Sequence, residues 1–235
     1  MLNVNYQDSH CLASFPSVVP LDSNHVSVVE NISTRLTFTK DEHVFQAGMP
    51  VNSVYVLVSG RIKLYRLSNL GRQVIQWFSY PGELFGLTDL NFTQQTTRSL
   101  YAQACETTEV LQVPKQAFVQ LLTKDPELSM LVIQHLSSRL NLAGDLLLCM
   151  TSDNATHKVI KLILRLYERY ASHDLNHQII DVNLTHQELA DMVGLCRQTM
   201  TTILSQLRKA QFIDFCGQKI IVCNADALHG MLTQS

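Results

Sequence analysis

The chain has 235 residues, of which 46% are hydrophobic and 16% are charged, and its formal net charge is −2. This length can bury one large core or two ordinary ones, and this composition excludes an intrinsically disordered protein. No apolar run reaches the roughly 18 residues that cross a bilayer, and the absence of Lys and Arg from the first twenty residues argues against a secretory signal.

The six cysteines are scattered along the chain without a C-x-x-C pair, so their spacing indicates neither a disulfide framework nor a zinc site. The simplest expectation is a protein of the reducing cytoplasm, with no membrane partner. The sequence contains no phosphate-binding loop, nucleophile motif or metal-spaced cluster. We therefore expect no enzymatic activity and no metal.

Residues 36–115 have the pattern of a β sandwich or barrel. Apolar and other side chains alternate through VYVLVSGRIKLY, and the runs RSLYAQA and TEVLQVP have the composition of further strands. The segments SNLG and Pro81-Gly82 are predicted turns. Glycines recur at intervals of 11 or 12 residues, as expected for short strands joined by turns; they are Gly48, Gly60, Gly71 and Gly82.

A long helix is predicted to begin at Asp125-Pro126, because Pro is favoured in the first helical turn. A helix that is apolar on more than one face needs two partners. One partner is expected to be the barrel, and the other is either a second copy of the chain or the core of the same chain. Apolar residues follow at helical spacing for some five turns: Val132, Leu136, Leu140, Ala143, Leu147 and Met150.

The segment TSDNATH, near residues 151–155, interrupts this helix with capping-type residues and precedes a new helical run, VIKLILRLYERY. It divides the chain into three predicted parts: a sensing barrel over residues 1–124, the long helix over 125–151, and a C-terminal domain over 152–235. In the last part we expect a charged, His-containing loop to about Asn183. The segment FIDFCGQKIIV is predicted to form a hairpin that turns at Cys216-Gly217-Gln218.

The stretch HQELADMVGLCRQTMTTILSQL, residues 186–207, is helical in pattern but contains Gly194. Glycine inside a helix costs about 1 kcal/mol relative to Ala, which favours two short helices separated at Gly194. Gly194 then allows the positive φ of a tight turn, and Ala190 is small where the second helix crosses the first. With the hairpin that follows, the sequence predicts a winged helix-turn-helix and an α+β protein.

The second helix of this motif is expected to read base edges in the major groove, with Arg197 and Gln198 at its N-terminal end. No acidic residue lies between Asp191 and Asp214, which suits a phosphate backbone. On its own, Arg197 would be an ordinary surface arginine. The candidate DNA-binding residues are Thr185, His186, Gln187, Arg197, Gln198, Thr201 and Thr202.

The order of barrel, long helix and winged helix-turn-helix resembles the CRP/FNR family of bacterial transcription regulators. The segments VYVLVSGRIKLYRL, GELFGL, RSLYAQA and LTHQELADMVGLCRQTMTTIL carry this resemblance over nearly the whole chain after about residue 30. It implies a cyclic-nucleotide-binding-like jelly-roll barrel, a dimerisation helix, and a homodimer on palindromic double-stranded DNA. It also implies effector control of DNA binding, and contact with RNA polymerase if the protein is an activator.

In cyclic-AMP-binding members a Gly-Glu pair and an Arg-Ser pair hold the ribose and phosphate. The resemblance therefore implies an effector site built from Gly82, Glu83, Leu84, Arg98 and Ser99. Two features depart from those members: fourteen residues separate Glu83 from Arg98, and Ala143-Gly144 replace hydroxyl side chains. A cyclic nucleotide is thus one candidate effector. Haem is a weaker candidate, with His135 as an example ligand, and an iron–sulfur cluster is excluded because Cys11 alone precedes residue 100.

The reader positions also depart from the family, since Gln198 replaces the usual Glu and Thr202 the usual Arg. We expect a DNA site that differs from the usual half-site at the bases these two residues read.

Cys196 lies at the N-cap of the predicted reader helix, where the helix dipole and Arg197 favour a thiolate. It is a candidate thiol sensor, and the alternative is a small cap residue without a signalling role. For the whole chain, the alternative function is a nucleotide-binding regulatory subunit that contacts protein rather than DNA.

Overall fold

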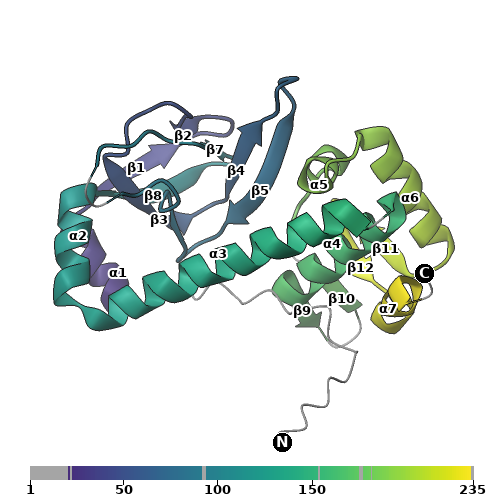
Figure 1. Cartoon of the computed structure of the whole chain (residues 1–235). Coiled ribbons are helices and arrows are strands. Elements are labelled where there is room, and N and C mark those ends of the chain that lie inside the picture. The colour runs from purple at the N-terminus through teal and green to yellow at the C-terminus, as the bar shows by residue number, and fades with distance from the viewer. Residues whose placement is uncertain are drawn as a thin grey trace, which may run out of the picture. The chain divides into compact units, whose positions relative to one another are not determined.

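The computed structural model of the chain describes residue 21 and residues 23–91, 94–152, 154–174, 177–180 and 182–233. These residues form two compact units. The first holds residues 21–139 together with 186–197, and the second holds residues 140–185 and 198–233. Each unit is described separately, in the element order of Figure 1.

Two antiparallel four-stranded sheets form the barrel of the first unit and confirm the predicted jelly roll. One sheet has the order β1 (Thr34–Phe38), β8 (Thr108–Pro114), β3 (Ser53–Ser59) and β6 (Leu84–Phe85). The other has the order β2 (His43–Phe45), β7 (Tyr101–Ala104), β4 (Ile62–Leu67) and β5 (Gln73–Ser79). The predicted turn glycines Gly71 and Gly82 both have positive φ, at 73° and 85°.

Strand β3 is buried on both faces because its alternating side chains enter two different hydrophobic clusters. Tyr55 and Leu57 belong to the cluster that also contains Ile62, Leu64, Phe85 and Val110. Val54 and Val56 belong to a second cluster, which helices cover. This strand therefore lies between two layers of core, which explains its continuous run of apolar residues.

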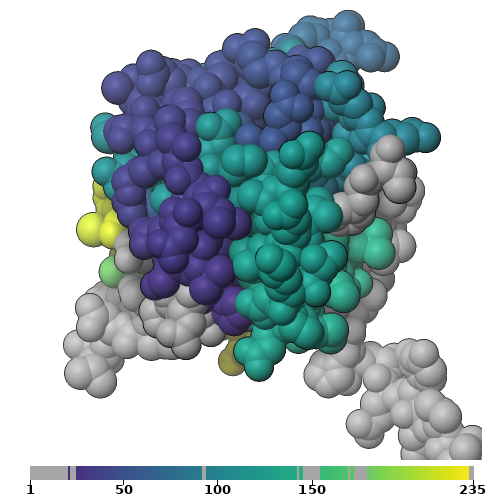
Figure 2. Space-filling view, turned by 90° about the vertical axis from the view of Figure 1, so that its left-hand side faces the viewer, coloured from purple at the N-terminus to yellow at the C-terminus, as the bar shows by residue number. Residues whose placement is uncertain are grey.

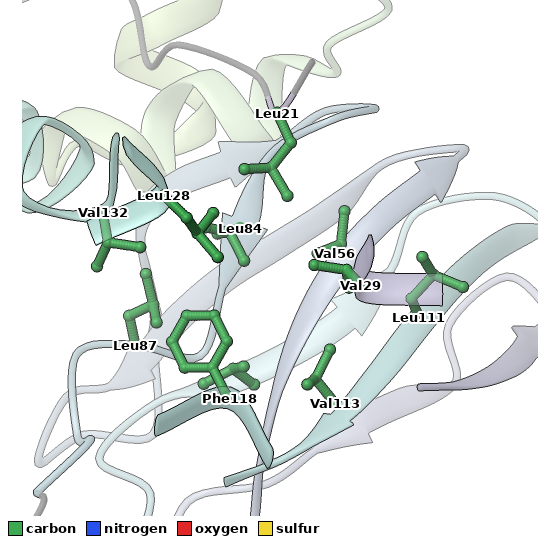
Figure 3. Close-up of a cluster of buried hydrophobic side chains, with 11 residues drawn as sticks. Leu21, Val29, Val56, Leu84, Leu87, Leu111, Val113, Phe118, Leu128 and Val132 are labelled. Atoms are coloured by element: carbon green, nitrogen blue, oxygen red, sulfur yellow. The ribbon is translucent and has the colours of Figure 1, made fainter. Parts of the chain in front are cut away.

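Three helices contribute to the second cluster: α1 (Ser23–Glu30), α2 (Lys115–Lys124) and the start of α3 (Pro126–Ser152). Figure 3 shows Phe118 of α2 and Leu128 and Val132 of α3 among the sheet residues of this cluster. In Figure 2 the purple surface around α1 lies beside the teal surface of the helices that follow the barrel. The sequence patterns did not predict α1 or α2.

The long helix begins at Pro126, as predicted, and Asp125 caps it by accepting a hydrogen bond from the Leu128 amide at 3.0 Å. The predicted interruption is also present, since α3 ends at Ser152 and α4 (Ala155–Tyr170) begins after Asn154. The Asn154 side chain accepts from the His157 amide at 2.9 Å and so forms the N-cap of α4.

The predicted loop before Asn183 is wrong in part, because it contains strands β9 (Ala171–Asp174) and β10 (His177–Ile180). These strands join β11 (Ile213–Cys216) and β12 (Lys219–Val222) in a sheet of order β11-β12-β10-β9. Residues 178–180 pair with residues 220–222, a partner distant in sequence that local patterning cannot identify. The hairpin β11–β12 turns at Gly217, as predicted, with φ of 62°. Helix α7 (Ala225–Thr233) follows it.

The remaining helices are α5 (His186–Val193) and α6 (Arg197–Lys209). Together with the sheets they give the α+β class expected from the sequence. None of the helices in the described part of the chain has both the length and the apolarity that crossing a bilayer requires.

Candidate nucleic-acid interface and barrel pocket

The stretch 186–207 bends at Gly194, as predicted. Helix α5 ends at Val193, Gly194 has φ of 69°, and α6 begins at Arg197. The Leu195 amide donates to the Ala190 carbonyl at 3.0 Å and closes the turn. A Cβ on Gly194 would meet no atom within 4 Å, so the backbone conformation rather than lack of space requires glycine there.

Helix α6 has one buried and one exposed face. The exposed residues nearest its start are Arg197, Gln198 and Thr202, three of the predicted DNA-binding residues, whereas Thr201 is half-buried. The Thr202 hydroxyl donates to the Gln198 carbonyl at 3.0 Å, which fixes its side chain along the helix. The buried face consists of the apolar residues Met200, Ile203, Leu204 and Leu207.

The predicted phosphate-contacting residues lie at the start of α5. Thr185 and Gln187 are exposed and His186 is half-buried. The Gln187 side-chain amide donates to the Asp191 carboxylate at 2.7 Å, one turn further along α5. This bond holds the side chain along the helix and uses only one of the hydrogen-bonding groups of its amide.

An ion pair that the sequence patterns did not identify connects the end of α6 to strand β11. Arg208 Nε lies 2.8 Å from Asp214 Oδ1, and the Arg208 guanidinium lies 5.8 Å from the centre of the Phe215 ring. Both charged side chains are exposed, so the pair contributes little to stability. It orients the hairpin relative to α6 within the same unit. Asp214 is the first acidic residue after the acid-free window, and this was the feature of the sequence that could have indicated the pair.

In the barrel, the predicted effector residue Glu83 is paired with Arg139 of α3. Arg139 Nη2 donates to Glu83 Oε2 at 3.1 Å, and these side chains are only 6% and 7% exposed. The Arg139 guanidinium also lies 4.8 Å from the centre of the Trp77 ring. The sequence patterns did not identify Arg139, although it falls at helical spacing after Leu128, Val132 and His135, which are also buried.

Arg98, the second predicted effector residue, is buried in the barrel. Its guanidinium donates to the Gly86 carbonyl at 2.6 Å and to the Ser53 carbonyl, and lies 4.3 Å from the centre of the Phe45 ring. Burial lowers the pKa of Arg98, and the neighbouring Tyr55 and Asp89 oppose this shift. Arg98 therefore binds the backbone of its own barrel.

The other predicted effector residues also have internal contacts. The Ser99 amide donates to Asp89 Oδ2 at 3.0 Å, and the Ser99 hydroxyl accepts from Arg66 Nη2 at 3.1 Å. The Gly82 amide donates to the Leu57 carbonyl at 2.8 Å. Leu84 is buried in the cluster beneath the helices.

Helix α3 exposes an apolar stripe on the side opposite its buried residues. Met130, Ile133, Leu136 and Leu140 are 55%, 54%, 40% and 74% exposed. Ala143 and Gly144 of the same helix are also exposed. The helix is thus apolar on two faces, as predicted, and the barrel covers one of them.

Cys196 is exposed immediately before α6. Within the described ranges, no three His, Cys, Asp or Glu side chains are grouped so that they could hold a metal ion.

Two family models match the chain, one for each kind of domain. Residues 35–125 match the cyclic nucleotide-binding domain, and residues 157–231 match the Crp-like helix-turn-helix domain. The global nitrogen regulator of Synechocystis sp. is 29% identical over 197 residues, which are 84% of this chain and 88% of that protein. The anaerobic regulatory protein of Pasteurella multocida is 27% identical over 209 residues, 88% of this chain and 76% of that protein. The solved structure of FixK2 from Bradyrhizobium japonicum is similar with a TM-score of 0.74 at 25% identity, covering 85% of this chain and 96% of that one.

Proposed function

The chain belongs to the CRP/FNR family of transcription regulators, and from this premise we infer that it binds a palindromic DNA site as a homodimer. It is a sequence-specific DNA-binding regulator whose barrel domain controls its C-terminal helix-turn-helix. The observation that supports the DNA contact is the exposed, acid-free start of α6, where Arg197 and Gln198 follow the glycine turn. Arg can donate two bonds to guanine, and Gln can pair with adenine.

Selection from a random duplex library, followed by fluorescence anisotropy on the recovered site, tests this function. Arg197→Ala should weaken binding by about ten- to a hundredfold, the range for one lost base contact. Arg35→Ala is the control, because Arg35 is an exposed arginine on the barrel that pairs with Glu30 and Glu109. Binding should also fall steeply as salt rises. Failure to recover any duplex would favour the alternative of a regulatory subunit that contacts protein.

The exposed stripe of α3 supports the homodimer. An apolar helix face of this length is costly in water and is typical of an interface between copies. Ile133→Glu should shift the protein to monomers in sedimentation velocity. Leu70→Glu is the matched control, since Leu70 is a leucine of the barrel hairpin that is 83% exposed and outside the stripe. A dimer that survives Ile133→Glu would contradict this interface.

Because it binds chromosomal DNA, we propose that the protein acts in the cytoplasm, and that it contacts RNA polymerase if it activates transcription.

A further inference from the structure

The family model that matches the barrel is that of a cyclic nucleotide-binding domain, so a cyclic nucleotide is the ligand that this match implies. A cyclic nucleotide offers an anionic phosphate diester and a ribose hydroxyl. It needs amide or guanidinium donors for the first and an acceptor such as a carboxylate for the second. In this chain Glu83, Arg98 and Ser99 have the required types. Each of them is already bound to another part of the protein.

The donors for a phosphate are bound to oxygens of the chain itself. The Ser99 amide donates to the Asp89 carboxylate at 3.0 Å, so an internal anion takes the donor that a phosphate oxygen would need. The Asp89 charge would also repel a phosphate in the same place. Arg98 is 3% exposed and donates to two backbone carbonyls. Redirecting its guanidinium would leave those buried carbonyls without donors, which is costly.

The acceptor for a ribose hydroxyl is bound to a cation of the chain. The Glu83 carboxylate accepts from Arg139 at 3.1 Å, and both side chains are more than nine-tenths buried. Separating two buried opposite charges leaves each of them uncompensated in a low-dielectric site. The pair with Arg139 does not use up the acceptor capacity of the carboxylate, so the misfit lies with the phosphate donors. Because the Ser99 amide and the Arg98 guanidinium both donate to oxygens of the chain, the residues do not fit the phosphate of a cyclic nucleotide.

We propose that Asp89 takes the place of the ligand's anion in the barrel, and that the ion pair between Glu83 and Arg139 attaches α3 to the barrel. The long helix is then attached to the barrel without a cyclic nucleotide. In this protein the signal that controls DNA binding is something other than a cyclic nucleotide in this pocket. The part of this proposal that concerns DNA rests on the proposed function, whereas the occupancy of the pocket does not.

The position of Arg139 on α3 gives the attachment a consequence for assembly. The exposed stripe of the same helix includes Leu136 and Leu140, three residues before Arg139 and one residue after it. Because residues on one helix move together, the bond from Arg139 to Glu83 sets the rotation at which these leucines face outward. Loss of the bond should weaken both the dimer and the binding of DNA, which needs two readers in register.

The occupancy is tested by isothermal titration calorimetry of the full-length protein with cyclic AMP and, separately, cyclic GMP. We expect no binding heat for either nucleotide up to about 1 mM, the weak end of specific affinity. Saturable binding with a dissociation constant in the micromolar range would overturn the proposal.

The attachment is tested with Arg139→Met, Glu83→Gln and the double variant, using Arg35→Met as the exposed arginine control. Each single change should lower the melting temperature, because it leaves one buried charge unpaired, and the double variant should recover most of this loss. DNA binding to the selected site should fall at least about tenfold in all three variants, a factor equivalent to about 1.4 kcal/mol, and added cyclic AMP should not restore it. The control should stay within about twofold of the wild type, as distant surface changes do.

The double variant separates attachment from folding. If it recovers both thermal stability and DNA binding, the pair is only a structural contact and the proposal is wrong. If it recovers stability but not DNA binding, the proposal holds. If the wild type itself selects no duplex, the proposed function fails, while the calorimetric titration and the dimer dissociation constant of Arg139→Met still decide the inference about the pocket.

Discussion

Gly86 and Arg98 lie so close together that a side chain on Gly86 would force its neighbours to shift by a few tenths of an ångström. A Cβ at Gly86 would lie 3.0 Å from Arg98 Nη1 and 3.3 Å from Cδ2 of Tyr55, and the φ of Gly86 is 79°. The same Nη1 donates to the Gly86 carbonyl at 2.6 Å. Gly86 thus accepts a hydrogen bond from the Arg98 guanidinium. Because Gly86 has no side chain, it also leaves the space that this guanidinium occupies.

Replacing Gly86 with Ala should therefore destabilise the barrel through two effects, left-handed backbone strain and the tight contact with Arg98. Their sum is about 2 to 4 kcal/mol, measured by equilibrium unfolding in urea. Gly48→Ala is the matched control, because Gly48 has φ of 88° but a Cβ there meets nothing within 4 Å. Gly48→Ala should lower the free energy of unfolding only by the left-handed backbone strain, about 1 to 2 kcal/mol. Equal losses in the two variants would show that the contact with Arg98 is unimportant.

Gly194→Ala should destabilise the turn between α5 and α6 by about 1 to 2 kcal/mol, because Ala is strained at the φ of 69° found there. Gly230→Ala should have the opposite sign and stabilise α7 by up to about 1 kcal/mol, since Gly230 lies within a helix and a Cβ there meets no atom within 4 Å. Differential scanning calorimetry of both variants gives the two signs. A stabilising Gly194→Ala would mean that the turn does not need its left-handed residue.

Gln198→Glu should change which base is preferred at one symmetric pair of positions in the DNA site. A carboxylate accepts hydrogen bonds where the amide of Gln both donates and accepts, so its preference moves toward a base that donates, such as cytosine. The expected discrimination is about 1 to 3 kcal/mol, measured by competition between single-base variants of the selected site. Thr185→Ala should instead weaken all sites equally, because a phosphate contact carries no sequence information. An unchanged preference in Gln198→Glu would remove this residue from the reader.

Cys196 stays a candidate thiol sensor, and its exposed position before α6 makes the test direct. Peroxide should abolish DNA binding by the wild type and by Cys216→Ser, which lacks a different exposed thiol, but leave Cys196→Ser active. Equal loss in all three proteins would contradict the hypothesis. Cys105 should not contribute, because burial raises the pKa of its thiol to about 11. At pH 8 that thiol is protonated, so iodoacetamide should label it only above about pH 10.

Local patterns in the sequence were sufficient for the elements that punctuate the chain. Glycines in turns, Pro126 at the start of α3 and Gly194 between α5 and α6 each impose a conformation on a few residues. Such constraints act over short distances, and the structure bears them out. The pairing of β10 with β12 joins residues remote in sequence, and no local rule identifies that partner, so the sequence predicts a loop where β9 and β10 form.

The barrel pocket was predicted in its residue types but not in its contacts. The side-chain types suit a nucleotide at three positions, Glu83, Arg98 and Ser99. A side-chain type alone does not say which partner the residue contacts. The partner of Glu83 is Arg139, which lies 56 positions further along the chain. On α3, Arg139 shares a buried face with His135 and Ser138. Because these three residues are polar, the apolar periodicity of the sequence does not predict that this face is buried.

Strand β3 connects the two hydrophobic clusters of the barrel unit. Because its two sets of side chains belong to separate clusters, neither the interior of the barrel nor the layer under the helices can be lost while the other persists. Melting should thus remove both layers in a single step, and the amides of Val54 to Leu57 should be the last in the barrel to exchange with deuterium.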